Sequence, residues 1–374
     1  MEGGGMKIFA LAFAAAIACV AYGNPEDAIM RLLNSKASGS PKSYEVAAQE
    51  VATMAKAEKN TPRRAVARIV TAIVSREHGA PKAARIDAQT RDEYIRTSTN
   101  LIMRLAKEKN NGLAWYLLSL ESEDTNMLRR AAICGNPQAL NAWGSLLVTT
   151  TLADALPEDE TNAALKDALG YFRRAADQND VNGLYNLGMC LARGLGTEVD
   201  AESAFNCFRT AAERGHPEAI NNIGYHFHEG IVVPKDVQLA ARWYRKSSDL
   251  GNAYGMYNYA TALMKGDGVE RDEAEGARLM KLSADAGCVE AMNAYAEALR
   301  DGRGVKSNPR EAFLLFRRAA EYGFWPAMEN IAGCYDKGIG TAANGQKGMV
   351  WRIRSRAARG DRNAQAWLAN NPGM

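Results

Sequence analysis

The sequence predicts an all-α protein, an α/α solenoid of antiparallel helix pairs with a further helical segment at its N-terminus. A glycine-containing loop recurs at a constant step of 36 residues, at Gly194, Gly230, Gly266, Gly302 and Gly338. Apolar residues on either side of each loop are spaced three and four residues apart, as on one face of a helix. No segment shows the alternation typical of a strand. Self-similarity with a period of about 20 to 50 residues is the signature of a repeat array.

The first 23 residues have the layout of a secretory signal peptide. Lys7 precedes an apolar run over residues 8–20, and Ala21-Tyr22-Gly23 places small residues where a signal peptidase reads the chain. The run is shorter than the roughly 20 residues of a membrane span, and no later stretch approaches that length. We therefore expect a signal peptide over residues 1–23, a mature chain without an integral membrane span, and a secreted or periplasmic location. A lipid anchor on Cys19 is a minor alternative.

Residues 24–109 form a separate N-terminal helical region, because they do not follow the 36-residue period. Helices are expected near 26–35, 43–59, 62–77 and 88–109. They are separated by Ser38-Gly39-Ser40-Pro41 and Gly79-Ala80-Pro81, which are typical turn sequences.

The repeat solenoid is expected over residues 110–374, beginning with two irregular units. Residues 113–134 resemble a shortened helix pair whose connector has lost its glycines. Residues 136–179 form a longer unit with an insertion over 149–161. Within this insertion, Glu158, Asp159 and Glu160 are interpreted as a solvated loop that leads into the second helix.

Five regular units follow, and each is predicted to contain two helices. In one unit, Leu184, Leu187 and Leu191 mark the apolar face of the first helix, and Ala204 and Phe208 mark that of the second. A residue suited to an N-cap precedes each second helix, at Asp200, Asp236, Asp272, Asn308 and Asn344. Small residues at 188, 224, 260 and 296 allow close helix contact, and Phe208, Tyr244 and Phe316 are predicted core residues. Residues 361–370 are expected to form a final first helix that caps the array.

Three short motifs resemble those of the Sel-one-like repeats, which are close relatives of the tetratricopeptide repeats. They are Tyr185-Asn186-Leu187-Gly188, Trp243-Tyr244 and Gly266-Asp267-Gly268-Val269. The resemblance covers about residues 136–370 and departs from the family pattern at Val232, which replaces a loop glycine, and at Ser247-Ser248, which replace two alanines. It implies a scaffold or adaptor that binds other proteins or peptides.

The candidate protein-binding residues are asparagines and tyrosines of the first helices, which usually line the concave surface of such solenoids. They are Tyr185, Asn186, Asn222, Tyr257, Asn258 and Asn330. A peptide could accept hydrogen bonds from this ladder of amides and pack on the tyrosine rings. Alternatively, the asparagines bond to neighbouring helices. This structural interpretation is preferred, because asparagine at this position belongs to the family pattern.

No pattern indicates catalysis, a cofactor or a metal site. His226 and His228 are two residues apart on a helix and so diverge by about 200°, which prevents both from facing one ion. The glycine loops join helix to helix and lack the GK[ST] ending of a phosphate loop. A net charge of +3 without a long basic run does not indicate nucleic-acid binding. The cysteines lack metal spacing, although a Cys190–Cys207 disulfide is conceivable.

The sequence therefore predicts a secreted or periplasmic, non-enzymatic scaffold that mediates protein–protein interactions. One alternative is a cell-envelope enzyme acting on a peptidoglycan-like substrate, an activity associated with some cysteine-rich relatives. Those relatives carry a recurring cysteine pair in each helix pair, which this chain lacks. The other alternative is a structural subunit of an assembly.

Overall fold

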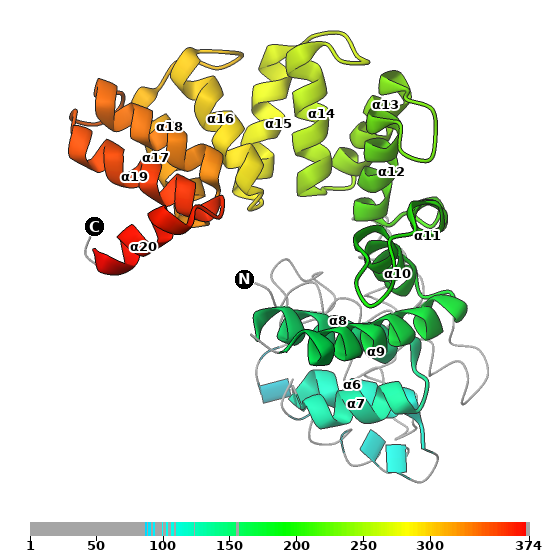
Figure 1. Cartoon of the computed structure of the whole chain (residues 1–374). Helices are drawn as coiled ribbons and strands as arrows, with labels where there is room; N and C mark the ends of the chain where they lie inside the picture. The colour runs from blue at the N-terminus through cyan, green and yellow to red at the C-terminus, as the bar shows by residue number, and fades with distance from the viewer. Residues whose placement is uncertain are drawn as a thin grey trace. The chain divides into compact units, whose positions relative to one another are not determined.

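The structure, a computed structural model, describes residues 110–371 apart from 123, 155 and 156, together with isolated residues between 87 and 107. This described part contains helices α6 to α20 and no strand (Figure 1), which confirms the predicted all-α class. The predicted signal peptide and the predicted helices over 26–35, 43–59 and 62–77 lie outside the described residues. Of the predicted helix over 88–109, the positions described up to residue 107 are helical.

The helices follow one another in packed pairs along the chain. The irregular pair is α6 (Gly112–Ser122) and α7 (Thr125–Ile133). The first helices of the later pairs are α8 (Pro137–Ala153), α10 (Val181–Arg193), α12 (Pro217–Glu229), α14 (Ala253–Lys265), α16 (Val289–Asp301) and α18 (Trp325–Lys337). Their second helices are α9 (Glu158–Asp177), α11 (Ala201–Glu213), α13 (Val237–Asp249), α15 (Glu273–Asp285), α17 (Pro309–Glu321) and α19 (Gly345–Ala358). Helix α20 (Arg362–Asn370) follows and packs on α19.

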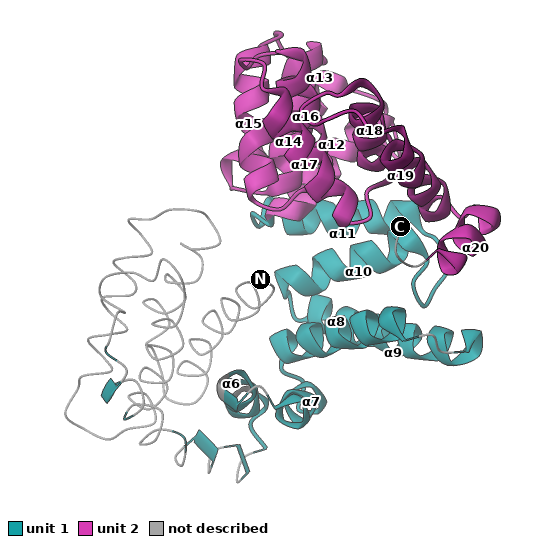
Figure 2. Ribbon diagram, turned by 90° about the vertical axis from the view of Figure 1, so that its left-hand side faces the viewer, with its two compact units in different colours: residues 1–216 teal, residues 217–374 magenta. Residues whose placement is uncertain are grey.

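The chain divides into two compact units (Figure 2). The first unit comprises residues 1–216, and its described helices are α6 to α11. The second unit comprises residues 217–374 and contains α12 to α20. None of the helices in the described part combines the length and the apolar character that crossing a membrane requires.

The predicted N-caps of the second helices are confirmed. In α11, α13, α15, α17 and α19, the capping side chain accepts a hydrogen bond from the backbone N–H three residues later, over 2.9–3.3 Å. These bonds satisfy amide groups that have no partner inside the helix. Each second helix therefore begins at the same place in its repeat.

Close contact between the two helices of a pair depends on a small residue that faces an aromatic ring. A Cβ atom at Gly188 would lie 2.7 Å from the Phe208 ring, and one at Gly224 would lie 2.7 Å from the Tyr244 ring. Phe208, Tyr244 and Phe316 are buried, so their prediction as core residues is confirmed. The apolar area that these rings remove from water is the main stabilising contribution of each pair.

Serine replaces alanine in the buried face of α13 without leaving an unsatisfied hydroxyl group. Ser247 is fully buried, and its Oγ donates to the carbonyl oxygen of Pro217 over 2.8 Å. Ser283 makes the same bond to Ala253 in the following pair, over 2.6 Å. The hydroxyl thus reaches an acceptor at the start of the first helix, which explains why serine is tolerated at position 247.

The interpretation of residues 158–160 as a loop is wrong. Glu158, Asp159 and Glu160 form the exposed first turn of α9, which starts directly after Pro157. Three negative side chains at a helix N-terminus interact favourably with the unpaired N–H groups and the helix dipole. The insertion therefore lengthens α8 and α9 instead of forming a long connector.

Asp180 is a buried acidic N-cap in the first unit. Its Oδ1 accepts a hydrogen bond from the backbone N–H of Gly183 over 2.7 Å. Burial raises the pKa of Asp180 to about 6, although bonds to the N–H groups of Gly183 and Asn182 oppose the rise. Asn136 and Asn252 cap their helices with the same bond and carry no charge. The carboxylate at position 180 is thus not required for the capping bond.

We expect Asp180→Asn to stabilise the protein near neutral pH. Because the folded pKa is above the ordinary value of 3.8, the unfolded chain loses its proton first as pH rises. The wild-type protein therefore loses stability between about pH 4 and pH 6, and the cost is complete above that range. The variant should gain up to about 3 kcal/mol at pH 7, since one pKa unit corresponds to about 1.4 kcal/mol. Denaturant unfolding across this pH range measures the gain.

The matched control is Asp200→Asn, at an exposed N-cap. The hydrogen bonds from Ser203 lower the pKa of Asp200, so its carboxylate stabilises the fold above its ordinary pKa and this contribution is lost as pH falls. Asp200→Asn should therefore give no gain at pH 7. A gain for Asp180→Asn that is the same at pH 4 and pH 7 would contradict the role assigned to burial.

The second glycine of each loop lets the loop lie directly against the backbone of the preceding second helix. Gly268 has a φ of +72°, and an added Cβ would overlap the carbonyl group of Val237 at the start of α13. Gly304 and Gly340 lie in the same way against Glu273 in α15 and Pro309 in α17. A residue with a side chain could adopt neither the positive φ nor this close approach to the helix backbone without strain.

Val232 occupies the corresponding loop position in the repeat formed by α12 and α13. It keeps the left-handed backbone with a φ of +68°, and 47% of its surface is exposed. A left-handed conformation costs an L-residue roughly 1–2 kcal/mol, and a β-branched side chain tolerates it poorly. Val232 is therefore a locally strained residue that contributes little packing.

We expect Val232→Gly and Gly268→Val to have opposite effects on the melting temperature. Relief of about 1–2 kcal/mol of strain in Val232→Gly should exceed the roughly 0.5–1 kcal/mol that glycine loses in chain entropy. Gly268→Val introduces both strain and overlap and should cost about 3 kcal/mol or more. Thermal melts followed by circular dichroism measure both changes. Equal melting temperatures for the two variants would contradict the close loop contact.

Candidate functional site

Asparagine side chains bridge neighbouring first helices. Asn258 Nδ2 in α14 donates to Asn221 Oδ1 in α12 over 2.8 Å, and Asn330 Nδ2 in α18 donates to Asn293 Oδ1 in α16 over 2.9 Å. In the first unit, Asn186 Nδ2 in α10 donates to Asn141 Oδ1 in α8 over 2.8 Å. In each pair, the donor belongs to the repeat that directly follows the repeat of its acceptor. Three of the predicted binding asparagines therefore hold first helices side by side.

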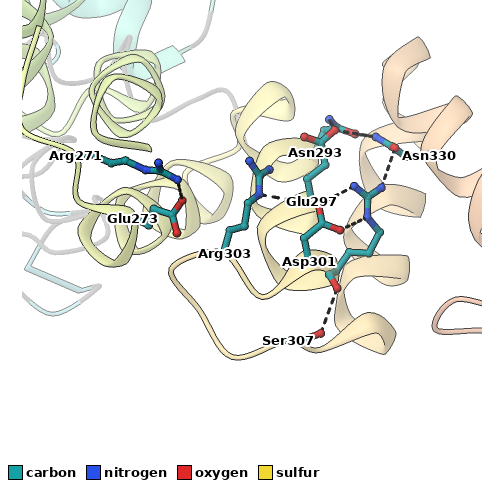
Figure 3. A network of polar contacts seen from close by, with 9 residues as sticks. Arg271, Glu273, Asn293, Glu297, Asp301, Arg303, Ser307 and Asn330 are labelled. Atoms are coloured by element: carbon teal, nitrogen blue, oxygen red, sulfur yellow. Dashed lines mark hydrogen bonds and ion pairs between the residues drawn. The ribbon is translucent and has the colours of Figure 1, made fainter. Parts of the chain in front are cut away.

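The pair at α16 and α18 extends into a larger polar network (Figure 3). Glu297 Oε1 accepts from Asn293 over 3.0 Å and from Asn330 over 3.1 Å. Arg300 donates to Asn330 Oδ1 over 3.3 Å and forms an ion pair with Asp301, with a 2.7 Å contact to its Oδ1. Asn293 is buried, so its amide needs these partners. The network fixes the rotamers of several side chains along these two helices.

The tyrosines predicted to bind a partner are only partly accessible. In the first unit, Tyr185 stacks on His216 with ring centroids 4.5 Å apart. In the second unit, Tyr257 packs against the core of its helices. Burial raises the pKa of Tyr257, and nearby negative charge, including that of Glu290 and Glu297, raises it further.

The predicted residues are divided between the two units. Tyr185 and Asn186 belong to α10 in the first unit, whereas Asn222, Tyr257, Asn258 and Asn330 belong to α12, α14 and α18 in the second unit. Protein binding by these six residues stays a prediction.

Two exposed tyrosines beside this ladder are absent from the sequence-based prediction. Tyr225 in α12 and Tyr254 in α14 each expose 50% of their surface. Tyr225 lies one turn after Asn221, and Tyr254 lies one turn before Tyr257, so all four share the stripe that runs along these helices. Helix periodicity counted outward from the ladder residues would have identified both. We call the exposed pair together with Tyr257 the tyrosine surface.

The first helices of the second unit carry mainly negative charge. Their carboxylates are Glu218, Glu229, Glu290, Glu297, Asp301, Glu329 and Asp336, whereas their cations are Lys265, Arg300 and Lys337. Arg300 is already paired with Asp301. The tyrosine surface is therefore set in an acidic surrounding, even though the whole chain has a net charge of +3.

The histidines and cysteines have separate local contacts. His226 Nδ1 lies 3.0 Å from the carbonyl oxygen of Ile231, whereas His228 contacts Glu229 over 2.7 Å and Asp267 over 3.2 Å. The described residues contain no group of three or more histidine, cysteine or acidic side chains that could hold a metal ion. Cys190 and Cys207 are free thiols, and burial raises the pKa of both.

Comparison with known proteins gives a match to the model of the Sel1 repeat at residues 162–180, 181–216, 217–252, 253–288, 289–324 and 325–351. A Sel1 repeat protein from Oxalobacter formigenes has a similar structure, with 24% identity, a TM-score of 0.52, and coverage of 69% of this chain and 96% of that one. A protective antigen with an SLR fold from uropathogenic Escherichia coli gives 24% identity, a TM-score of 0.49, and coverage of 86% and 66%. No curated protein matches the chain.

Proposed function

Because the chain belongs to the Sel1 repeat family, whose members generally mediate protein–protein interactions, we propose that it is a scaffold that binds a partner protein through the first helices of its second unit. The observation that carries this proposal is the tyrosine surface, formed by Tyr225, Tyr254 and Tyr257. Tyrosine supplies a large contact area and a polar hydroxyl at a small entropic cost, and it is enriched among the residues that dominate binding energy.

The asparagine bonds stabilise the first helices that carry the proposed surface. Asn258 and Asn330 hold α14 and α18 against the preceding first helices, so the side chains between them keep fixed positions. A surface that is ordered before binding loses less entropy when a partner docks. In this proposal the asparagines position the helices, while the tyrosines make the direct contacts.

The surrounding charge supports a partner segment that carries lysine or arginine. The negative charge of Glu290 and Glu297 on α16 contributes to the raised pKa of Tyr257, after its burial. A cation can stack on an exposed aromatic ring and pair with the carboxylates of the first helices. Binding should therefore weaken as ionic strength rises.

The capture experiment compares Tyr225→Ala/Tyr254→Ala with the wild-type chain. Proteins crosslinked to the full-length protein in its native cells are recovered and quantified by mass spectrometry. Loss of both rings should reduce recovery of the direct partner at least tenfold, because truncation of such a residue often costs about 2 kcal/mol or more. The melting temperature should change little, since both rings are half exposed.

Two control variants separate binding from folding. Tyr322→Ala removes a tyrosine that is 63% exposed at the end of α17, on a second helix, and should leave capture unchanged. Asn258→Ala should lower the melting temperature, because it leaves the Asn221 side chain without its bonded partner. Equal capture by the double tyrosine variant and the wild type would show that the partner binds elsewhere.

We further propose that the protein acts outside the cytoplasm, in a secreted or periplasmic form. The support is the charged start, the short apolar run and the Ala21-Tyr22-Gly23 ending of the N-terminal sequence. N-terminal sequencing of the native protein should find a mature end close to Asn24. Recovery of cytosolic material that still begins at Met1 or Met6 would contradict this location.

A further inference from the structure

A pocket of about 290 Å³ lies in the first unit, between the chain segment that precedes α6 and the end of α7. Helices α6 and α7 pack side by side in this unit (Figure 2). The apolar lining comes from Ala106 before α6, Trp115 in the first turn of α6 and Ile133 at the end of α7. Ala106 and Trp115 are buried, whereas 63% of the surface of Ile133 is exposed. The pocket therefore has a buried apolar floor and an accessible apolar edge.

A turn at Asn110 brings the walls of the pocket together. Asn110 has a left-handed backbone with a φ of +46°, which asparagine adopts more readily than most residues. The N–H of Asn111 donates to the carbonyl oxygen of Ala106 over 3.2 Å, which closes the turn. The thiol of Cys134, the C-cap of α7, donates to Asn110 Oδ1 over 3.1 Å. This bond orients the amide of Asn110, whose Nδ2 donors have no acceptor among the described residues.

Two cations line the same pocket. Lys107 and Arg130 are exposed, and neither forms an ion pair with a described residue. The described residues that line the pocket include no aspartate or glutamate. The guanidinium carbon of Arg130 lies 5.0 Å from the centroid of the Trp115 ring, and this stacking restricts the arginine without using its N–H groups. The pocket thus combines donors from Lys107, Asn110 and Arg130 with uncompensated positive charge.

The last carbonyl groups of α7 are already paired. Those of residues 130, 131 and 132 accept hydrogen bonds from the backbone N–H groups of residues 134, 136 and 135, over 3.0–3.1 Å. Unpaired carbonyl groups at a helix C-terminus would repel an anion. Pairing reduces that repulsion, so the side-chain cations decide the charge that the pocket accepts.

We propose that this pocket binds a small organic acid, in which one carboxylate is attached to a compact apolar group such as a phenyl ring. The carboxylate accepts charge-assisted hydrogen bonds from Lys107 and Arg130 at the exposed edge. The apolar group packs on the floor formed by Ala106 and Trp115 and against Ile133. A volume at the lower end of the range for ligand sites fits one ring or one branched chain, and it is too small for a nucleotide. This site lies outside the tyrosine surface and does not rest on the scaffold function.

The test uses the full-length protein and 4-fluorobenzoate, whose binding broadens its fluorine NMR signal. Binding should be saturable, with a Kd on the order of 1 mM or tighter for a ligand of about ten heavy atoms. 4-Fluorobenzamide has nearly the same shape without the charge and should bind at least about tenfold more weakly. Inorganic phosphate should also bind more weakly than 4-fluorobenzoate, because it has no apolar group to cover the floor.

Paired substitutions separate the two pocket cations from overall charge. Lys107→Gln/Arg130→Gln should raise the Kd for 4-fluorobenzoate at least about tenfold, because two charge-assisted contacts are lost. The matched control Arg129→Gln/Arg173→Gln removes the same charge from exposed positions on α7 and α9 that do not line the pocket. Its Kd should stay within about threefold of wild type. If loss of the Arg130 stacking prevents folding, Lys107→Gln alone should raise the Kd about fivefold at an unchanged melting temperature.

Cysteine alkylation locates the bound acid. Cys134 lines the pocket, whereas Cys207 belongs to α11, and both thiols are half-buried. Burial raises the pKa of both thiols, so their reactions can be compared at one pH. Saturating 4-fluorobenzoate should slow the reaction of Cys134 with iodoacetamide and leave that of Cys207 unchanged, as measured by peptide mass spectrometry.

Four results would overturn the proposal. The first is an absence of saturable binding of 4-fluorobenzoate to the wild-type protein. The second is equal binding of 4-fluorobenzamide or of inorganic phosphate, which would remove the role of the charge or of the apolar floor. The third is an equal loss of binding in the control variant. The fourth is unchanged alkylation of Cys134 at saturation, which would place the acid elsewhere. None of these results depends on the tyrosine surface, so the two proposals fail separately.

Discussion

The close contact between each loop and the preceding second helix is the constraint on which the second unit depends. At Gly268, Gly304 and Gly340 the backbone of the loop touches the first turn of the helix before it, and a side chain would prevent this approach. The contact sets the distance between successive helix pairs. Only at that distance can Asn258 reach Asn221 and Asn330 reach Asn293. Steric exclusion at the loops thus determines which hydrogen bonds form along the first helices.

The repeat position that Asn221 and Tyr257 share serves two purposes. Asn221 bonds to Asn258, which stands in the next repeat one position later, and the two amides join their helices. Tyr257 stands at this position in the following repeat, and Ala294, 37 residues further on, takes the place of the bonding asparagine. Both Tyr257 and Ala294 pack against the core. Polar bridges and aromatic contacts therefore alternate along the first helices, so the bridges provide rigidity while the tyrosines between them provide contact area.

Charge is unevenly distributed over the helices of the second unit. The first helices taken together carry more carboxylates than cations, although α14 itself has only Lys265, whereas α19 is basic.

The sequence by itself determined the all-helical class, the 36-residue repeat, the caps such as Asp200 and the buried rings such as Phe208. These features depend on local spacing, on capping chemistry and on backbone conformations that favour glycine, all of which are visible within one repeat. Only the tertiary structure decided the roles of the binding candidates. Asn258 is bonded to a residue 37 positions away, and Tyr225 keeps half of its surface exposed. The same holds for the helical first turn at Glu158 and for the raised pKa of Asp180. Each of these outcomes depends on the burial and partners that neighbouring helices supply, and a residue's own repeat position does not specify them.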